Sequence, residues 1–308
     1  MIVLLVPELE ALLAEAGQAP GRLVAIMARG QRRQLDELHY QSELICGQAL
    51  SPAALSRQID KPSEAGGYWL RADPIGLRPD LNAVWLQTGF EFPAPEAPGA
   101  EAAAGLIAEL QQLFQDEGLS FDLPHPGRGY LRLDRTPECR FHPPWQLAGL
   151  SMDHVLPEGP EQQRWRRLLN ECQMLMHQAA QGSEASLPQG LWFWGAGSLP
   201  SPESIKARVS HVQSGDPVLI GLADWLQLSH APGSTSAPAD QSLLEWRANP
   251  ALDADENLQA LNAWLAPAWR RLRLAGIQAL ELASEKQAWV LGPVDAWCVW
   301  RRAVVSPI

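Results

Sequence analysis

An arginine and an aspartate at alternate positions form the first candidate for ligand contact. Arg71 and Asp73 follow an aromatic and apolar run that begins at Tyr68. Pro74 disfavours the helical conformation of Asp73, so the sequence predicts that a strand ends there. Strand ends are where α/β proteins place ligand-contacting groups, so Arg71 could bind an anion and Asp73 could accept a hydrogen bond. The alternative is a turn in which Asp73 caps backbone N–H groups and Arg71 is solvated or paired.

A polar stripe on a predicted helix over 162–180 is the second candidate. At 100° per residue, four side chains lie within about 60° of one another beside the apolar face of this helix: Arg166, Asn170, Gln173 and His177. His177 could act as a base and Arg166 could bind an anion. The alternative is that the stripe is the solvated edge of an amphipathic helix.

The third candidate is the run Trp192-Phe193-Trp194-Gly195-Ala196-Gly197, which predicts a buried strand that ends in a glycine turn. Gly195 and Gly197 would leave backbone N–H groups accessible to a ligand. The alternative is that the glycines make room for the packing of the tryptophans. The chain has neither a GxGxxG nor a GxxxxGK[ST] motif, so the phosphate-binding signal is weak.

We expect Asp73, Gln173, His177 and Trp194 to surround one cleft, because a short loop joins the helix to the strand that ends at Trp194. The seven histidines include no pair at i, i+4 and no HExxH motif, and GxSxG is also absent. The sequence therefore predicts no metal site and no cofactor, and it identifies no catalytic residue.

The elements that would position these residues follow from apolar periodicity and turn residues. Helices are predicted over 8–16, 20–29, 52–58, 100–117, 162–180 and 255–275, the last interrupted by Pro267. Strands are predicted over 1–6, 68–72, 81–86, 120–123, 130–134, 191–194, 243–247, 277–282, 288–291 and 296–301. This mixture predicts one α/β domain over 1–308, with a central mixed sheet flanked by helices and a C-terminal antiparallel strand meander.

Two stretches are predicted to be loops. The stretch 92–99 is rich in proline, and the stretch 231–240 has a Pro, Ser and Gly composition typical of a mobile surface loop.

Charge and composition limit the partners and the compartment. Lys and Arg total 24 against 35 Asp and Glu, a net charge of −11, which argues against nucleic acid. No apolar run approaches the ~20 residues of a membrane span, so no membrane partner is expected. Met1 to Val6 lacks the basic flank of a secretory signal, and the four cysteines are scattered. We therefore expect a cytoplasmic protein with reduced thiols.

Several blocks resemble the RpfE-type family of bacterial proteins, whose members are regulatory or uncharacterised. The blocks are WLRADP at 69–74, NECQML at 170–175, LWFWGAGSLP at 191–200 and WCVWRR at 297–302. The WxWGxG pattern, with Gly221-Leu222-Ala223 downstream, also looks like a segment of the archaeal-type cofactor-independent phosphoglycerate mutases.

The mutase resemblance implies a core of the alkaline phosphatase superfamily. That superfamily uses two metal ions held by Asp and His, with a Ser or Thr nucleophile, and its first metal-binding Asp follows the first strand. Here that strand ends Leu5-Val6-Pro7-Glu8, without the Asp. The resemblance therefore implies the core without the two-metal activity.

Together these observations predict a non-catalytic or catalytically degenerate cytoplasmic regulatory or binding protein. Its partner would be an unknown protein or a small anionic ligand. The alternative is a metal-dependent phosphotransferase or phosphomonoesterase similar to the mutases.

Overall fold

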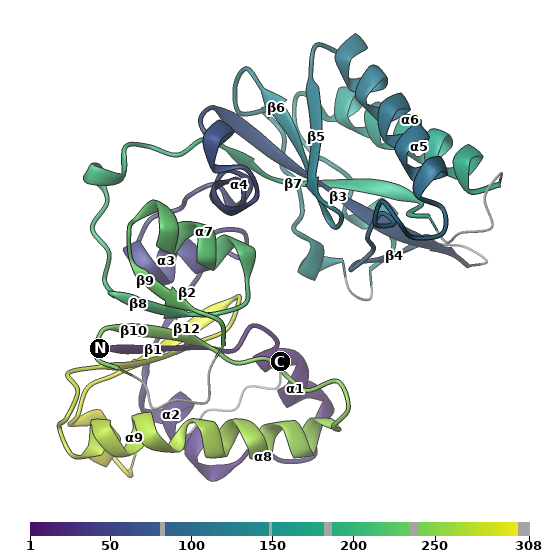
Figure 1. The fold of residues 1–308 in the computed structure, drawn as a ribbon. Coiled ribbons are helices and arrows are strands. Elements are labelled where there is room, and N and C mark those ends of the chain that lie inside the picture. The colour runs from purple at the N-terminus through teal and green to yellow at the C-terminus, as the bar shows by residue number, and fades with distance from the viewer. Residues whose placement is uncertain (81–83, 148–149, 182–186, 234–238, 301–308) are drawn as a thin grey trace. The chain divides into compact units, whose positions relative to one another are not determined.

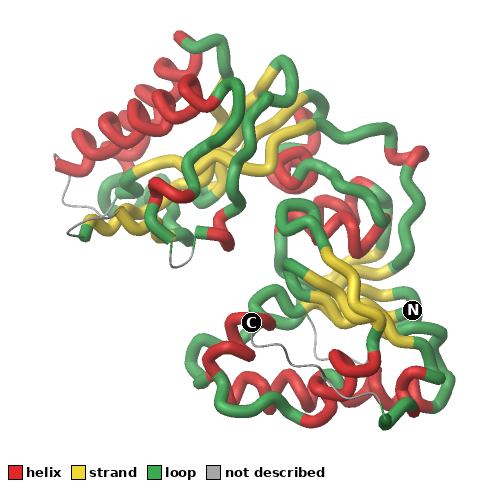
Figure 2. The backbone as a smooth tube through the Cα atoms, turned by 180° about the vertical axis from the view of Figure 1, so that it is seen from behind, coloured by secondary structure: helices red, strands yellow, loops and turns green. Residues whose placement is uncertain are grey.

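The chain folds into two compact units, where the sequence predicted one domain. The computed structural model describes residues 1–80, 84–147, 150–181, 187–233 and 239–300. One unit, called here the α/β unit, combines residues 1–49 with 201–308, and the other, the antiparallel unit, is the continuous segment 50–200. Both units mix helices with sheet, which confirms the predicted α/β class (Figures 1 and 2).

Within the described residues, the α/β unit is built on a seven-stranded mixed sheet in the order β2-β12-β11-β1-β10-β8-β9. Its strands are β1 (Ile2–Leu5), β2 (Gln31–Gln34), β8 (His211–Gln213), β9 (Ser229–Ala231), β10 (Ser242–Glu245), β11 (Leu280–Ala283) and β12 (Gln287–Leu291). β1 pairs in parallel with β10 on one side and with β11 on the other. Its uniformly apolar sequence fits a central strand that is buried on both faces.

Helices cover both faces of this mixed sheet (Figure 1). They are α1 (Leu9–Glu15), α2 (Gly21–Arg29), α3 (Tyr40–Cys46), α7 (Pro217–Trp225), α8 (Ala254–Trp264) and α9 (Ala266–Arg273). The core between α1, α2, α8, α9 and the sheet is built from aliphatic side chains such as Leu4, Leu261 and Leu282. α8 begins with a capping box made by Asp253 and Glu256.

The antiparallel unit is built on strands that all pair antiparallel. They are β3 (Tyr68–Pro79), β4 (Val84–Gln87), β5 (Ser120–His125), β6 (Arg128–Leu133) and β7 (Gly190–Gly197). Among the described residues of this unit, the helices that flank these strands are α4 (Pro52–Asp60), α5 (Ala100–Asp116) and α6 (Gln162–Gln181). Phe193 of β7 packs against Phe114 of α5 and Trp165 of α6, so these two helices lie on one face of the sheet.

The predicted strand end at Asp73 is wrong, because β3 continues from Tyr68 to Pro79. Asp73 therefore lies inside a strand and not at its end. Pro74 has no backbone N–H to donate. A proline is therefore tolerated at a strand position that has no hydrogen-bonded neighbour strand on that side. On one side of β3, pairing with β6 stops at Arg71 and pairing with β4 starts at Gly76, so Pro74 lies between the two partners.

Two further boundaries differ from the prediction. β7 continues through Gly197, so the predicted glycine turn after Trp194 belongs to the strand. The predicted last strand over 296–301 is instead a short 3-10 helix, Asp295–Trp297, and residue 301 lies outside the described residues. β11 and β12 do form an antiparallel pair near the C-terminus, as predicted.

Two loops are predicted from the sequence. The stretch 92–99 contains neither helix nor strand. Half of the stretch 231–240, residues 234–238, lies outside the described residues, so the mobile loop stays a prediction. Among the described helices, none is both long and apolar enough to cross a membrane.

Gly129 of β6 marks a close approach of two strands, and its replacement tests the packing of the antiparallel unit. A Cβ at Gly129 would lie 2.3 Å from the carbonyl oxygen of Ala72. We expect Gly129→Ala to lower the free energy of unfolding by about 1–3 kcal/mol through overpacking. The measurement is urea denaturation followed by tryptophan fluorescence.

Gly105→Ala is the matched control, because a Cβ at Gly105 on α5 would meet no atom within 4 Å. That variant should gain stability by about 0.5–1 kcal/mol, since alanine favours a helix over glycine. Equal stability of the two variants would contradict the tight approach at Gly129.

Candidate functional site

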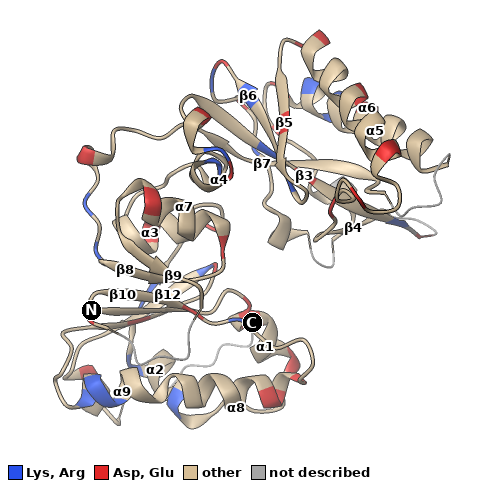
Figure 3. Ribbon diagram, in the orientation of Figure 1, with Lys and Arg blue, Asp and Glu red and all other residues tan. Residues whose placement is uncertain are grey.

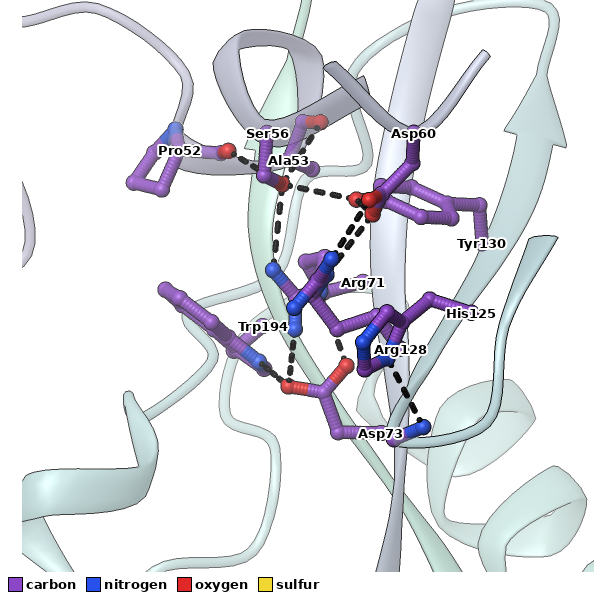
Figure 4. A network of polar contacts seen from close by, with 11 residues as sticks. Pro52, Ala53, Ser56, Asp60, Arg71, Asp73, His125, Arg128, Tyr130 and Trp194 are labelled. Carbon is purple, nitrogen blue, oxygen red and sulfur yellow. Dashed lines mark hydrogen bonds and ion pairs between the residues drawn. The ribbon is translucent and has the colours of Figure 1, made fainter. Parts of the chain in front are cut away.

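Arg71 and Asp73 form a buried ion pair on one face of β3. Residues i and i+2 of a strand share a face, so the two side chains lie side by side. Arg71 donates from Nε to Oδ1 of Asp73 and from Nη2 to Oδ2, both at 2.8 Å. Trp194 of β7, paired with Arg71 in register, donates its Nε1 proton to Oδ2 of Asp73 at 2.7 Å (Figure 4). The structure thus brings together three of the predicted site residues.

The network continues from Arg71 onto α4 and β6 (Figure 4). Nη1 of Arg71 donates to the Ser56 hydroxyl at 3.0 Å, and the Tyr130 hydroxyl lies 3.0 Å from Ser56 Oγ and 2.5 Å from Asp60 Oδ2. Arg128 donates two hydrogen bonds to the Asp60 carboxylate, at 2.6 and 2.7 Å. Two arginines therefore balance two aspartates, and each charge has a partner.

Burial and pairing act in opposite directions on these carboxyl groups. Burial raises the pKa of Asp73, and the hydrogen bonds from Arg71 and Trp194 oppose that rise. Burial also works to raise the pKa of Asp60, but the hydrogen bonds from Arg128 and Tyr130 outweigh it, and the net shift is downward. Since both aspartates are engaged by arginines, neither is available as a free general base.

A cavity of about 180 Å³ lies beside this network. Four of its lining side chains are charged or can be: Asp73, Glu91, His125 and Arg128. Ligand sites for drug-sized molecules occupy about 300–1,000 Å³, so this cavity fits only a small polar molecule. Asp73 thus contributes to a cavity wall, although it does so from the middle of a strand.

The four predicted residues of α6 have other contacts. Arg166 donates to the carbonyl oxygen of Pro157 at 2.9 Å, and Gln173 donates to Sδ of Met152 at 3.4 Å. His177 pairs with Gln181 on its own helix at 2.9 Å, and Asn170 is exposed. None of these contacts belongs to the hydrogen-bonded network around Arg71.

Side chains alternate between the two faces of a strand, and this alternation separates the α6 residues from the Arg71 network. Phe193 points toward Trp165 of α6, with ring centroids 5.7 Å apart, whereas Trp194 reaches Asp73. Adjacent residues of a strand face opposite sides of the sheet. The helix therefore packs against the face that does not carry the Arg71 network.

Gly195 and Gly197 allow the start of α4 to approach β7 closely. A Cβ at Gly197 would lie 2.9 Å from Cβ of Ser51, and both glycines have a positive φ. Ser51 donates to the Gly195 carbonyl oxygen at 2.7 Å and accepts from the N–H of Ala54 at 3.1 Å, which caps α4. Gly195 and Gly197 therefore make room for the packing of neighbouring elements, which is the second of the two alternatives given for this glycine pair.

A second polar cluster, not identified from the sequence, lies at the carboxyl ends of parallel strands in the α/β unit. Arg247 follows β10, and its guanidinium faces three carboxylates. It lies 2.6 Å from Glu245, 3.2 Å from Asp216 and 3.8 Å from Glu8. Open α/β sheets bind their ligands at this edge. We call these four residues the Arg247 cluster.

Backbone and side-chain contacts hold the acids of the Arg247 cluster in place. Asp216 caps α7 by accepting from the N–H of Val218 at 2.9 Å, and Gln41 donates to the same oxygen at 2.9 Å. Ser214 donates to the other oxygen of Glu245 at 2.5 Å. The dipeptide Asp216-Pro217 is a helix-start signal that could have located this part of the cluster.

Burial and neighbouring carboxylates raise the pKa values of two acids at this edge of the sheet. Burial and the neighbouring Glu245 raise the pKa of Asp216, and Arg247 opposes them. Burial, with Glu10 and Glu8 nearby, raises the pKa of Glu285 to about 8. Glu285 follows β11 at the same edge, so this part of the unit carries surplus negative charge.

The two metal ions implied by the mutase resemblance do not fit these residues. Glu245 and Asp216 already contact Arg247, and their remaining oxygens hold Ser214, Gln41 and α7. Across the described ranges, no group of three or more His, Cys, Asp or Glu side chains is arranged to hold a metal ion. The guanidinium supplies the positive charge here.

No family model and no curated protein matches the chain. Among solved structures it is similar to a cofactor-independent phosphoglycerate mutase from Thermoplasma acidophilum DSM 1728, with 15% identity, 94% of this chain and 89% of that chain covered, and a TM-score of 0.36. It is also similar to the PH0037 protein from Pyrococcus horikoshii, with 8% identity, coverages of 94% and 87%, and a TM-score of 0.44. Both likenesses are weak, and the RpfE-type resemblance stays a prediction.

Removal of the Asp73 carboxylate tests the buried pair. We expect Asp73→Ala to lower the free energy of unfolding by about 3–5 kcal/mol, because Arg71 would remain buried without its counter-charge. Asp134→Ala is the control, since Asp134 is exposed at the end of β6, and it should change stability by less than about 0.5 kcal/mol. A loss of only about 1 kcal/mol in Asp73→Ala would indicate a simple cap.

The raised pKa of Glu285 predicts a pH-dependent stability. Because the folded protein holds this proton more tightly than the unfolded chain, stability falls as pH rises from the unfolded value toward about 8. Glu285→Gln removes this loss. The variant should therefore exceed the wild type in Tm by a margin that grows from pH 5 to pH 8 and then stays constant.

Thermal denaturation across this pH range measures the effect. Glu15→Gln, on the exposed side of α1, is the control and should follow the wild type. A Tm difference for Glu285→Gln that does not change with pH would show that the Glu285 carboxyl ionises normally.

Proposed function

We propose that this chain is a non-catalytic or catalytically degenerate regulatory or binding protein. The observation that carries the proposal is the Arg247 guanidinium, which lies among Glu8, Asp216 and Glu245 at the ligand-binding edge of the mixed sheet. Acids at this edge would be the natural holders of a catalytic cation. In this chain they hold an arginine.

An arginine cannot replace a metal ion in catalysis. The guanidinium keeps its proton at all physiological pH values, offers no open coordination position and generates no metal-bound nucleophile. Ser214, whose hydroxyl donates to Glu245, is 1% exposed, so it is not accessible to a substrate. The edge therefore supports a structural use of its acids.

The cavity beside Asp73 supports the binding part of the proposal. Arg128 and His125 line it and could donate hydrogen bonds to a small anionic ligand. Asp73 and Glu91 on the same cavity favour a ligand that also carries a hydrogen-bond donor. Another protein remains the second class of partner, and it would need a surface outside this cavity.

Activity assays test the absence of catalysis. The purified chain would be incubated with p-nitrophenyl phosphate and with 3-phosphoglycerate, each with Mg²⁺, Mn²⁺ or Zn²⁺. We expect no turnover above that of a heat-denatured sample. Metal-dependent turnover that Glu245→Gln abolishes would contradict the proposal and would favour the phosphotransferase or phosphomonoesterase alternative.

Replacement of Arg247 tests the role of its charge directly. Arg247→Met leaves Glu8, Asp216 and Glu245 without a counter-charge, and since Arg247 is half exposed we expect a loss of about 1–3 kcal/mol. Millimolar Mg²⁺ should raise the Tm of Arg247→Met more than that of the wild type, because the freed carboxylates attract a cation.

Arg271→Met is the matched control, because Arg271 pairs with the exposed Asp240. It should cost less than about 1 kcal/mol and gain nothing from Mg²⁺. Wild-type stability in Arg247→Met would show that the acids do not depend on this guanidinium.

A further inference from the structure

We propose that a basic, tryptophan-bearing surface of the α/β unit docks an acidic, amphipathic peptide segment of a partner protein. The surface consists of Arg22, Trp269, Arg270, Arg273, Leu274 and Trp297, and we call it the Arg–Trp surface. It encloses a hollow of about 480 Å³. The inference concerns a different place from the Arg247 cluster, so each can fail without the other.

Apolar side chains are unusually exposed around this surface. Leu274 is 69% exposed and Trp297 is 53% exposed. Of the nine large hydrophobic residues exposed among the described residues, five fall between 274 and 300: Leu274, Val294, Trp297, Val299 and Trp300. Of these five, Leu274 and Trp297 line the hollow, together with Trp269. Apolar side chains exposed together on a folded protein are typical of an interaction site.

The charges of the Arg–Trp surface are all positive and lack acidic partners. Within the described ranges, Arg22, Arg270 and Arg273 form no ion pair, whereas the arginines of both polar clusters described above are paired with carboxylates. The arginines of α9 mark a basic end of the unit in Figure 3. In a chain with a net charge of −11, unpaired arginines side by side form a local anion-binding surface.

Internal contacts fix the orientation of the surface. The Arg273 guanidinium lies 4.0 Å from the centre of the Trp297 ring, and Trp297 donates its Nε1 proton to the Arg273 carbonyl oxygen at 3.2 Å. Arg22 donates to the Asn262 carbonyl oxygen. These side chains lose little rotamer freedom when a partner binds, so the surface is organised before binding.

The combination of residues favours a peptide over other anionic partners. Trp and Arg dominate the binding energy of protein interfaces, and the aliphatic Leu274 adds an apolar contact. A long polyanion or an anionic bilayer would also meet the net negative field of the chain, which opposes association. A short segment that alternates Glu with Leu or Phe places its charges on the arginines alone.

The test uses the full chain and a dye-labelled twelve-residue peptide composed of Glu, Leu and Phe. Fluorescence anisotropy measures its binding at low salt, with a peptide that has Lys in place of Glu as the charge control. We expect the acidic peptide to bind and the Lys peptide not to bind. Arg270→Glu with Arg273→Glu should weaken binding at least about tenfold, because both arginine charges are reversed.

Two further variants separate the apolar and charge contributions from general effects. Leu274→Asp, at a position that is 69% exposed, should also weaken binding without loss of Tm. Arg32→Glu, on the exposed face of β2, reverses one arginine charge elsewhere in the unit and should leave binding unchanged.

Several outcomes would overturn the proposal. These are no binding of the acidic peptide, equal weakening by Arg32→Glu, or full binding by the Arg270 and Arg273 double variant. Tighter binding to phosphatidylserine vesicles or to a single-stranded oligonucleotide, lost in the double variant, would assign the surface to a membrane or to nucleic acid. Self-association in light scattering that the double variant removes would assign it to a second copy of the chain.

Discussion

A guanidinium buried away from water has to be paired with a carboxylate, and the sheets of both units depend on such ion pairs. Arg71 is 4% exposed between β3 and α4, and Glu281 is 0% exposed within the mixed sheet. Glu281 accepts from Arg33 at 2.6 Å and from Arg208 at 2.9 Å. An unpaired charge at either place would cost several kcal/mol, so each partner is required as long as the other remains.

This pairing limits what the polar residues can do chemically. A carboxylate held by an arginine is neither a free base nor an open metal ligand, and Asp73 and Glu245 are both held in this way. Arg57, 0% exposed, reaches Asp122 at 2.6 Å and lies 4.3 Å from the centre of the Trp69 ring. Its charge therefore serves to attach α4 to the sheet. The buried polar groups of both units act mainly as connections between elements.

The sequence predicted what depends on local pattern and missed what depends on distant partners. The helix Gln162–Gln181 and the apolar strand Ile2–Leu5 follow from periodicity within one segment. Asp73 inside β3 could not be predicted, because the tolerance of Pro74 depends on where β6 and β4 pair. Local rules placed a turn there, and strand pairing overrode them.

The candidate site shows the same division between local and distant information. Arg71 and Asp73 were identified together because they are near in sequence, but their pairing on one strand face depends on Asp73 lying inside β3. The Arg247 cluster joins residues more than two hundred positions apart, Glu8 and Arg247, through the parallel pairing of β1 with β10. The sequence pattern of β1 or of β10 alone does not predict how the two strands pair. Only the assembled sheet therefore shows that these charged side chains meet.

Whether an arginine belongs to the fold or faces a partner depends on its neighbours and not on its local sequence. Arg247 and Arg270 are both exposed on the same unit, yet Arg247 faces three carboxylates, and Arg270 lines a hollow whose charged groups are all arginines. Where the chain supplies the counter-charge, the arginine stabilises the carboxylates that surround it. At the Arg–Trp surface the neighbours of the arginines are tryptophan and leucine. One acidic, amphipathic partner can pair with these arginines and also cover the exposed apolar side chains.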